Sequence, residues 1–154
     1  MATRSQDEVR AEFIEKVGLI SQSDGMPRIA GRTFGMFLFD GEVRSFGQIA
    51  AELQVSKASV STATRILEGR GLIKRIGLPG QRQDYFQLAE NPFPEMLVNI
   101  AAGLKKAKSE IDDSIVEIDP ANEGARRRLG HYVNFYQALI HLAQTAADDL
   151  KDPD

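Results

Sequence analysis

The sequence predicts a mainly helical protein with one small β-hairpin. Apolar residues recur at helical spacing over most of the 154 residues, and capping signals precede several of these stretches. Two short runs of strand composition, residues 72–78 and 83–88, flank the turn-forming tetrapeptide Pro79-Gly80-Gln81-Arg82. An apolar content of 42% is typical of a chain that buries a core.

The composition excludes several classes of site. The chain has no cysteine, so it can form no disulfide, thiolate metal site or cysteine nucleophile. His131 and His141 would lie on different sides of a helix, and we therefore expect no metal site. No glycine-rich phosphate loop or catalytic motif is present, so we expect no cofactor and no enzyme.

The sequence shows no segment suited to export or to a membrane. The N-terminus lacks the apolar run of a signal peptide, and no apolar stretch is long enough to span a bilayer. The absence of cysteine also suits a reducing compartment. We therefore expect a cytoplasmic protein with no membrane partner.

Positive charge is concentrated in the middle of the chain. The net charge is −3, but residues 25–88 carry nine basic and five acidic residues, while both flanks are acidic. Between Ser56 and Arg82 only Glu68 opposes the basic residues. A local surplus of this kind is typical of a surface that binds nucleic acid.

Two helices are predicted before the central motif. Apolar residues at helical spacing, with acidic residues in the first turns, predict a helix over residues 7–21. After a break, Pro27 predicts the start of a second helix, capped by Asp24 or Gly25, that ends near Phe39. A short extended segment should follow.

Two short helices joined by a tight turn come next. Ser45 and Gln48 have the spacing of a capping box for a helix over residues 46–54. Ser56 is placed to cap the following helix, over residues 57–70. This arrangement is typical of a helix-turn-helix, although glycine is absent from the turn.

The second of these helices has one apolar and one polar face. If Val60 points inward, Ala63, Thr64 and Leu67 fall on the same side. The opposite side then carries small polar and basic residues, which let a helix lie deep in the major groove of DNA. A solvated surface with no ligand remains the alternative for each of them. The residues expected to contact DNA here are Ser56, Lys57, Ser59, Ser61, Thr62 and Arg65.

The β-hairpin that follows has the pattern of a wing. Its tip carries Gln81 and Arg82, and an arginine at this position is suited to a narrow minor groove. Lys74 and Arg75 point to opposite faces of a strand, so at most one belongs to the DNA surface. We include Arg75 among the expected DNA-binding residues.

Arg28 and Arg32 lie one turn apart near the start of the predicted second helix. They are placed either to clamp a phosphate or to form an ion pair with acidic residues of a neighbouring helix or subunit. Both alternatives remain open, and both residues are included among the expected DNA-binding residues.

Two long helices are predicted after a linker at residues 91–94, the first ending near Glu117 and the second covering residues 122–150. Apolar residues along the second form a heptad-like seam, which a second apolar row, residues 132, 135, 139, 142 and 146, widens. Together with the first helix, they carry more apolar surface than one small module covers, which predicts dimerisation. The residues expected at the dimer interface are Phe13, Val17, Leu129, Val133, Tyr136, Ile140 and Ala143.

These predictions divide the chain into three regions. Residues 1–24 should form an N-terminal dimerisation helix, and residues 25–90 a winged helix-turn-helix that binds DNA. Residues 91–154 should form a C-terminal helical dimerisation region.

Three segments give the chain a resemblance to a known family. Residues 25–32 (GMPRIAGR), 55–61 (VSKASVS) and 79–85 (PGQRQDY) resemble the GbsR-like branch of the MarR transcriptional regulators. The resemblance covers residues 25–88. It implies a homodimer with interlocked terminal helices, in which each subunit presents a recognition helix and a wing to one operator half-site. It also implies that some members respond to small molecules, but it assigns no ligand residue.

The expected function is therefore sequence-specific binding of double-stranded DNA by a homodimeric transcriptional regulator. We expect a repressor that occupies a palindromic operator and that a small-molecule effector releases. The alternative is an adaptor, in which the winged helix serves protein interaction and the C-terminal helices bind a protein partner. The acidic C-terminal region and the negative net charge favour this alternative.

Overall fold

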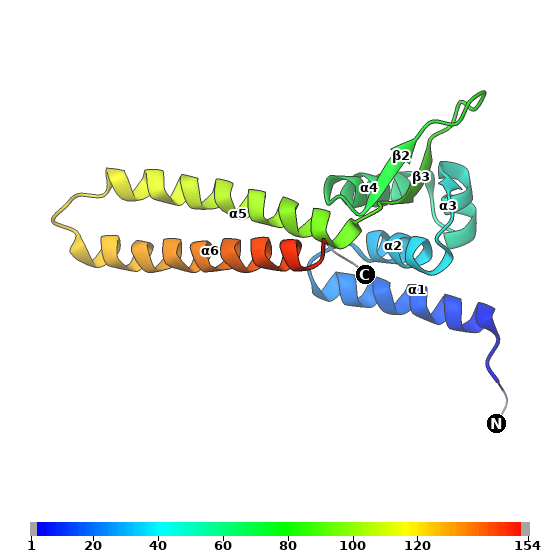
Figure 1. Cartoon of the computed structure of the whole chain (residues 1–154), viewed down its shortest axis with the longest axis horizontal. Helices are drawn as coiled ribbons and strands as arrows, with labels where there is room; N and C mark the ends of the chain where they lie inside the picture. Colours follow the sequence, from blue (N-terminus) through cyan, green and yellow to red (C-terminus); the bar gives the residue numbers. More distant parts are fainter. Residues whose placement is uncertain (1–2, 152–154) are drawn as a thin grey trace. The chain divides into compact units, whose positions relative to one another are not determined.

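The computed structural model describes residues 3–151, which form two compact units. The first unit extends to Pro92, and its described residues form four helices and a three-stranded sheet (Figure 1). The second unit begins at Phe93 and consists of a pair of long helices. The predicted fold class, mainly helical with a small β-hairpin wing, is confirmed.

Helices α1 (Gln6–Ser23) and α2 (Arg28–Asp40) pack against each other in the first unit. The N-cap residue of α2 is Pro27, which offers no side-chain cap. The prediction that Asp24 or Gly25 caps α2 is wrong, because α1 extends further than predicted. Asp24 is its C-cap residue, and Gly25 has a φ of 86° in the turn that follows.

Helices α3 (Phe46–Leu53) and α4 (Lys57–Gly69) form the predicted helix-turn-helix. Both predicted caps are present, at Ser45 and Ser56. The turn contains Gln54 with a φ of 54°, a left-handed conformation that glycine usually adopts. The turn therefore forms without glycine.

Strands β1 (Arg44–Ser45), β2 (Ile73–Ile76) and β3 (Tyr85–Leu88) form an antiparallel sheet in the order β1-β3-β2. The predicted extended segment is β1, which pairs with β3. Strands β2 and β3 are shorter than the predicted runs, and with their connecting turn they form the wing, which projects beyond α3 and α4 (Figure 1).

The core of the first unit lies between α2, α3, α4 and the sheet. The face of α4 that was predicted to point inward is buried. This burial fixes the rotation of α4 about its axis, so its polar face is left exposed. The largest fully buried side chains include Phe37, Phe86, Met36, Ile49, Leu67, Leu72 and Val60.

Helices α5 (Pro92–Glu117) and α6 (Glu123–Asp149) lie side by side in the second unit (Figure 1). The prediction of a linker over residues 91–94 is wrong, because Pro92 and Pro94 lie in the first turn of α5. A proline is tolerated there, since the missing N–H has no helical partner in any case. Among the described residues, no helix is both long and apolar enough to cross a bilayer.

Candidate nucleic-acid interface

The outer face of α4 carries the polar and basic residues predicted to contact DNA. The inward face is held by the core, with Val60, Ala63 and Leu67 fully buried. The structure leaves Ser56, Lys57, Ser61, Thr62 and Arg65 exposed and Ser59 partly exposed.

Some of the hydroxyl groups on this face already form hydrogen bonds within the protein. The Oγ of Ser56 accepts a hydrogen bond from the Ser59 backbone N–H at 3.1 Å and lies 3.0 Å from the Ser59 Oγ. Thr62 donates to the Ala58 carbonyl at 3.1 Å. Ser56 therefore serves as a helix cap, and Thr62 bonds within α4.

Three side chains of this face are available to a ligand. Within residues 3–151, those of Lys57, Ser61 and Arg65 make no hydrogen bond or ion pair. Their charge and hydrogen-bonding capacity is therefore free to meet phosphates or base edges.

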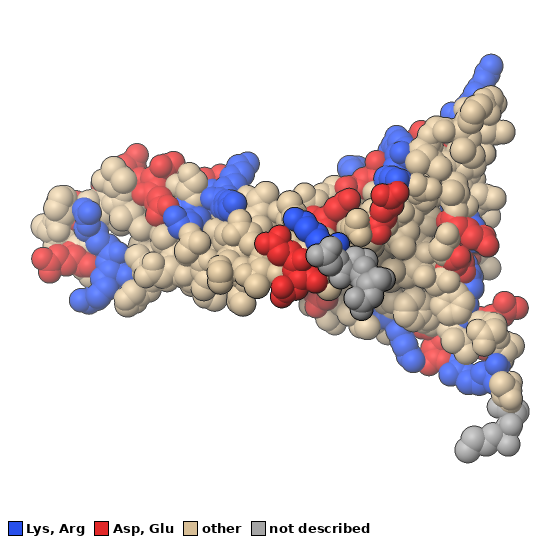
Figure 2. Space-filling view, viewed as in Figure 1, with Lys and Arg blue, Asp and Glu red and all other residues tan. Residues whose placement is uncertain are grey.

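The wing brings a further cation to the same side of the unit. Gln81 and Arg82 are exposed at its tip, and Figure 2 shows basic groups at the outer end of the wing. Arg82 and Lys57 line one pocket of about 350 Å³, which also includes Gly47. The sequence pattern did not predict that residues 82–84 of the wing, the start of α3 and the start of α4 line a common pocket.

The side chain of Arg75 already contacts other residues of the first unit. Its guanidinium donates to Glu68 at 3.1 Å and to Asp84 at 3.0 Å, and it lies 5.3 Å from the centre of the Phe86 ring. These contacts join the wing to α4. A DNA contact by Arg75, as predicted, would require these ion pairs to break.

Arg28 and Arg32 also pair within the first unit. Each donates to Glu15 of α1 at 2.8 Å, and Arg32 lies 3.3 Å from the Leu53 carbonyl oxygen. Burial raises the pKa of Glu15, but the two arginines lower it by more, so the net shift is downward and the carboxylate stays charged. Of the two alternatives, the structure shows the ion pair with a neighbouring helix.

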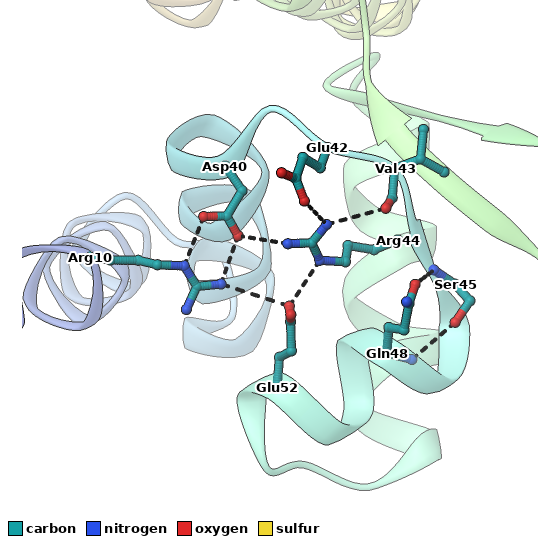
Figure 3. Close-up of polar contacts among 8 residues, drawn as sticks. All are labelled: Arg10, Asp40, Glu42, Val43, Arg44, Ser45, Gln48 and Glu52. Atoms are coloured by element: carbon teal, nitrogen blue, oxygen red, sulfur yellow. Dashed lines mark hydrogen bonds and ion pairs between the residues drawn. The ribbon is translucent and has the colours of Figure 1, made fainter. Parts of the chain in front are cut away.

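A second ionic cluster lies where α1, α2, β1 and α3 meet (Figure 3). Arg44 donates to Asp40 at 3.2 Å, to Glu42 at 2.7 Å and to Glu52 at 3.0 Å, and its side chain is only 13% exposed. Arg10 of α1 donates to both carboxylate oxygens of Asp40, at 2.8 and 2.7 Å. Arg10 also lies 3.7 Å from Glu52. We call Arg10, Asp40, Arg44 and Glu52 the junction cluster.

The contacts of the junction cluster favour the charged forms of Asp40 and Arg44. The hydrogen bond from Arg10 lowers the pKa of Asp40 by more than burial raises it. Burial alone would lower the pKa of Arg44, but hydrogen bonds to Glu42 and Glu52 outweigh it and raise that pKa. Sequence reasoning missed this cluster, because its members come from separate elements and no local pattern links them.

The predicted dimer residues of α1 pack within the first unit. Phe13 is partly buried, with its ring centre 5.9 Å from that of Phe39. Val17 is partly buried and lies beside Gly35 of α2. Leu19 and Ile20 near the end of α1 are exposed.

The heptad-like seam of α6 is largely covered in the single chain. Ile140 and Ala143 are buried, while Leu129, Val133 and Tyr136 are partly buried. The neighbouring row is more exposed: Phe135 is 57% exposed and Leu142 is 64% exposed. Helix α6 therefore leaves apolar surface exposed along this second row.

Comparisons with known proteins agree with this geometry. Residues 24–84 match the MarR family model, and this segment contains the helix-turn-helix and most of the wing. The chain is 37% identical over 83 residues to the HTH-type transcriptional regulator MmpR5 of Mycobacterium tuberculosis, a match that covers 53% of this chain and 50% of that protein. The chain thus spans about half the length of this relative. A crystal structure of a transcriptional regulator superposes with a TM-score of 0.82 and 26% identity, covering 91% of this chain and 96% of that one.

Proposed function

We propose that this protein is a cytoplasmic, homodimeric transcriptional regulator of the MarR family that represses by occupying a palindromic DNA operator. The match of residues 24–84 to the MarR family model supports the proposal. One observation carries the proposal: among the described residues, Lys57, Arg65 and Arg82 are exposed cations without an ion pair, on α4 and the adjacent wing. The activity is occupancy of a site, without catalysis.

The geometry suits α4 and the wing to different grooves of the DNA. With α4 in the major groove, Arg65 is suited to a bidentate contact with guanine, and Ser61 to a base edge or a phosphate. Lys57 near the start of α4 is suited to a phosphate. Arg82 at the tip of the wing is suited to the adjacent minor groove.

Exposed apolar side chains on both units support dimerisation. Leu19 and Ile20 of α1, and Phe135 and Leu142 of α6, leave apolar surface in water. Exposed apolar patches often mark interaction sites. We therefore propose that residues 1–24 and 91–154 form the dimer contacts around the DNA-binding region, residues 25–90.

The finer assignment is to the GbsR-like branch. The segments at residues 25–32, 55–61 and 79–85 support it. By the same resemblance, we propose that a small-molecule effector releases the protein from DNA.

The second candidate is a protein-interaction adaptor. Residues 89–154 carry seven basic and twelve acidic residues, which favours a basic protein partner for the C-terminal helices. In this case the exposed face of α4 would have no DNA ligand.

Selection of binding sites from random duplex DNA at moderate salt tests the proposal. The wild-type protein should enrich a palindrome with half-site centres about 10 base pairs, or a multiple of that, apart. Arg65→Ala should enrich it poorly, whereas Arg127→Ala, a change to an exposed arginine of α6, should behave as wild type. Failure of the wild-type protein to enrich any palindrome would favour the adaptor.

A further inference from the structure

We propose that the junction cluster is a positioning device. It holds α3 at a set orientation relative to α1, and through α3 it sets the spacing between the two α4 helices of a dimer. The inference rests on the proposed function, because this spacing matters only in a dimer that binds DNA.

Helices α1 and α2 form a rigid pair. A Cβ at Gly18 would lie 2.7 Å from a side-chain carbon of Arg32, and one at Gly35 would lie 3.3 Å from the Ile14 Cα. Helices that approach this closely have little freedom to slide. Arg10 also forms a bidentate ion pair with Asp40, the last residue of α2 (Figure 3).

Helix α3 has only eight residues. Its buried side chains are Ile49 and Leu53. These apolar contacts anchor α3 in the core, and its first residue, Phe46, donates its backbone N–H to the Asp84 carbonyl at 3.0 Å. Glu52 supplies directional contacts, to Arg44 at 3.0 Å and to Arg10 at 3.7 Å.

Arg44 is the central residue of the junction cluster, and its backbone belongs to strand β1 of the sheet. Arg44 lies opposite Phe86 in the pairing of β1 with β3, so its backbone is tied to the wing. Its planar guanidinium meets carboxylates of α2, of α3 and of the loop before β1. One side chain therefore relates α2, α3 and the wing to one another.

The ion pairs of the junction cluster are better suited to positioning α3 than to stabilising the fold. Taking charges out of water offsets much of their attraction, so partly buried ion pairs add little net stability. Their fixed hydrogen-bond geometry still restricts how the elements lie. Because α3 is joined to α4 by a turn of three residues, 54–56, a rotation of α3 would be passed on to α4.

The test uses the palindrome selected by the wild-type protein and versions with one base pair added or removed at its centre. Wild type should prefer the selected spacing by about tenfold or more, the size of a typical mismatch penalty. Glu52→Gln keeps the shape of the side chain but removes its charge. It should reduce the preference by about three- to fivefold, as expected for one partly exposed ion pair.

Three further variants complete the design. Arg10→Gln should act as Glu52→Gln does, and Arg10→Lys should restore part of the preference. Arg4→Gln is the matched control, because Arg4 pairs with Glu12 near the same end of α1 and contacts no member of the junction cluster in the described residues. It should keep the wild-type preference.

The outcomes separate this inference from the function on which it rests. If wild type selects no palindrome, the proposed function fails. If wild type discriminates and the Glu52 and Arg10 variants keep the same preference, the positioning role is overturned. Equal loss of affinity at every spacing, or unfolding of both variants, would show a structural role only and would also overturn it.

Discussion

Gly31 of α2 lies so close to Ser21 of α1 that a Cβ atom at Gly31 would come within 2.5 Å of the Ser21 Oγ. It would also lie 2.8 Å from the backbone carbonyl oxygen of Val17, which cannot turn aside as a side chain can. This close approach makes α1 an integral part of the first unit, together with the helix-turn-helix.

Gly31→Ala should therefore destabilise the first unit. Over-packing at a close helix crossing should lower the free energy of unfolding by about 1–3 kcal/mol, measured by urea denaturation. Gly69→Ala is the control, because a Cβ at Gly69 would meet no atom within 4 Å. It should be neutral or slightly stabilising. Equal stability of Gly31→Ala and wild type would contradict the packing.

Asp40 should make stability depend on pH in the acid range. Its pKa lies below the ordinary value of 3.8 because of the hydrogen bond from Arg10. A carboxyl with a lowered pKa stabilises the folded state above its ordinary pKa, and this contribution is lost as the pH falls through the lower, folded pKa.

Asp40→Asn should therefore be less stable than wild type near neutral pH, and the difference should shrink as the pH falls below 3.8. Urea unfolding at a series of pH values measures this. Asp113→Asn, a change at an exposed position of α5, should show no such difference. A gap between Asp40→Asn and wild type that stays constant into acid would refute the linkage.

Leu142 and Ile140 of α6 should respond differently to a negative charge. Leu142 is 64% exposed, so Leu142→Glu should keep its helix content by circular dichroism and yield monomers by light scattering. Ile140 is 2% exposed, so Ile140→Glu should unfold the second unit, because it buries a charge without a partner. A dimeric Leu142→Glu protein would remove the second row from the interface.

Arg82 and Arg75 should differ in their contribution to the salt dependence of DNA binding. Loss of a phosphate or groove contact at Arg82 should weaken binding and make the slope of log K against log salt shallower by about 0.9. Arg75→Ala should change the slope less, because Glu68 and Asp84 already compensate this charge. A slope for Arg82→Ala identical to that of wild type would exclude the contact.

Local signals predicted much of the fold. Two local signals predicted where α3 and α4 begin: the capping box of Ser45 with Gln48, and the cap at Ser56. Each signal involves residues close together in the sequence, so the sequence alone located the starts of both helices. The apolar periodicity around Val60 predicted which face of α4 is buried. Pro92 and Pro94 misled the prediction, because proline suits both a linker and the first turn of a helix.

The candidate site could be predicted only in part. Exposure of Lys57 and Arg65 follows from the rotation of α4, which periodicity determines. The partners of Arg75 and the junction of Arg10 with Glu52 depend on tertiary contacts between distant segments. Charge patterns along a sequence do not show which cations are already paired.

The most direct measurement is the mass of the complex between the wild-type protein and its selected duplex, by sedimentation or light scattering. Two recognition helices joined in one dimer predict two protomers on each palindrome, and no stable complex on a duplex whose sequence has been scrambled. One protomer per duplex, or equal binding to both duplexes, would contradict sequence-specific recognition by a dimer.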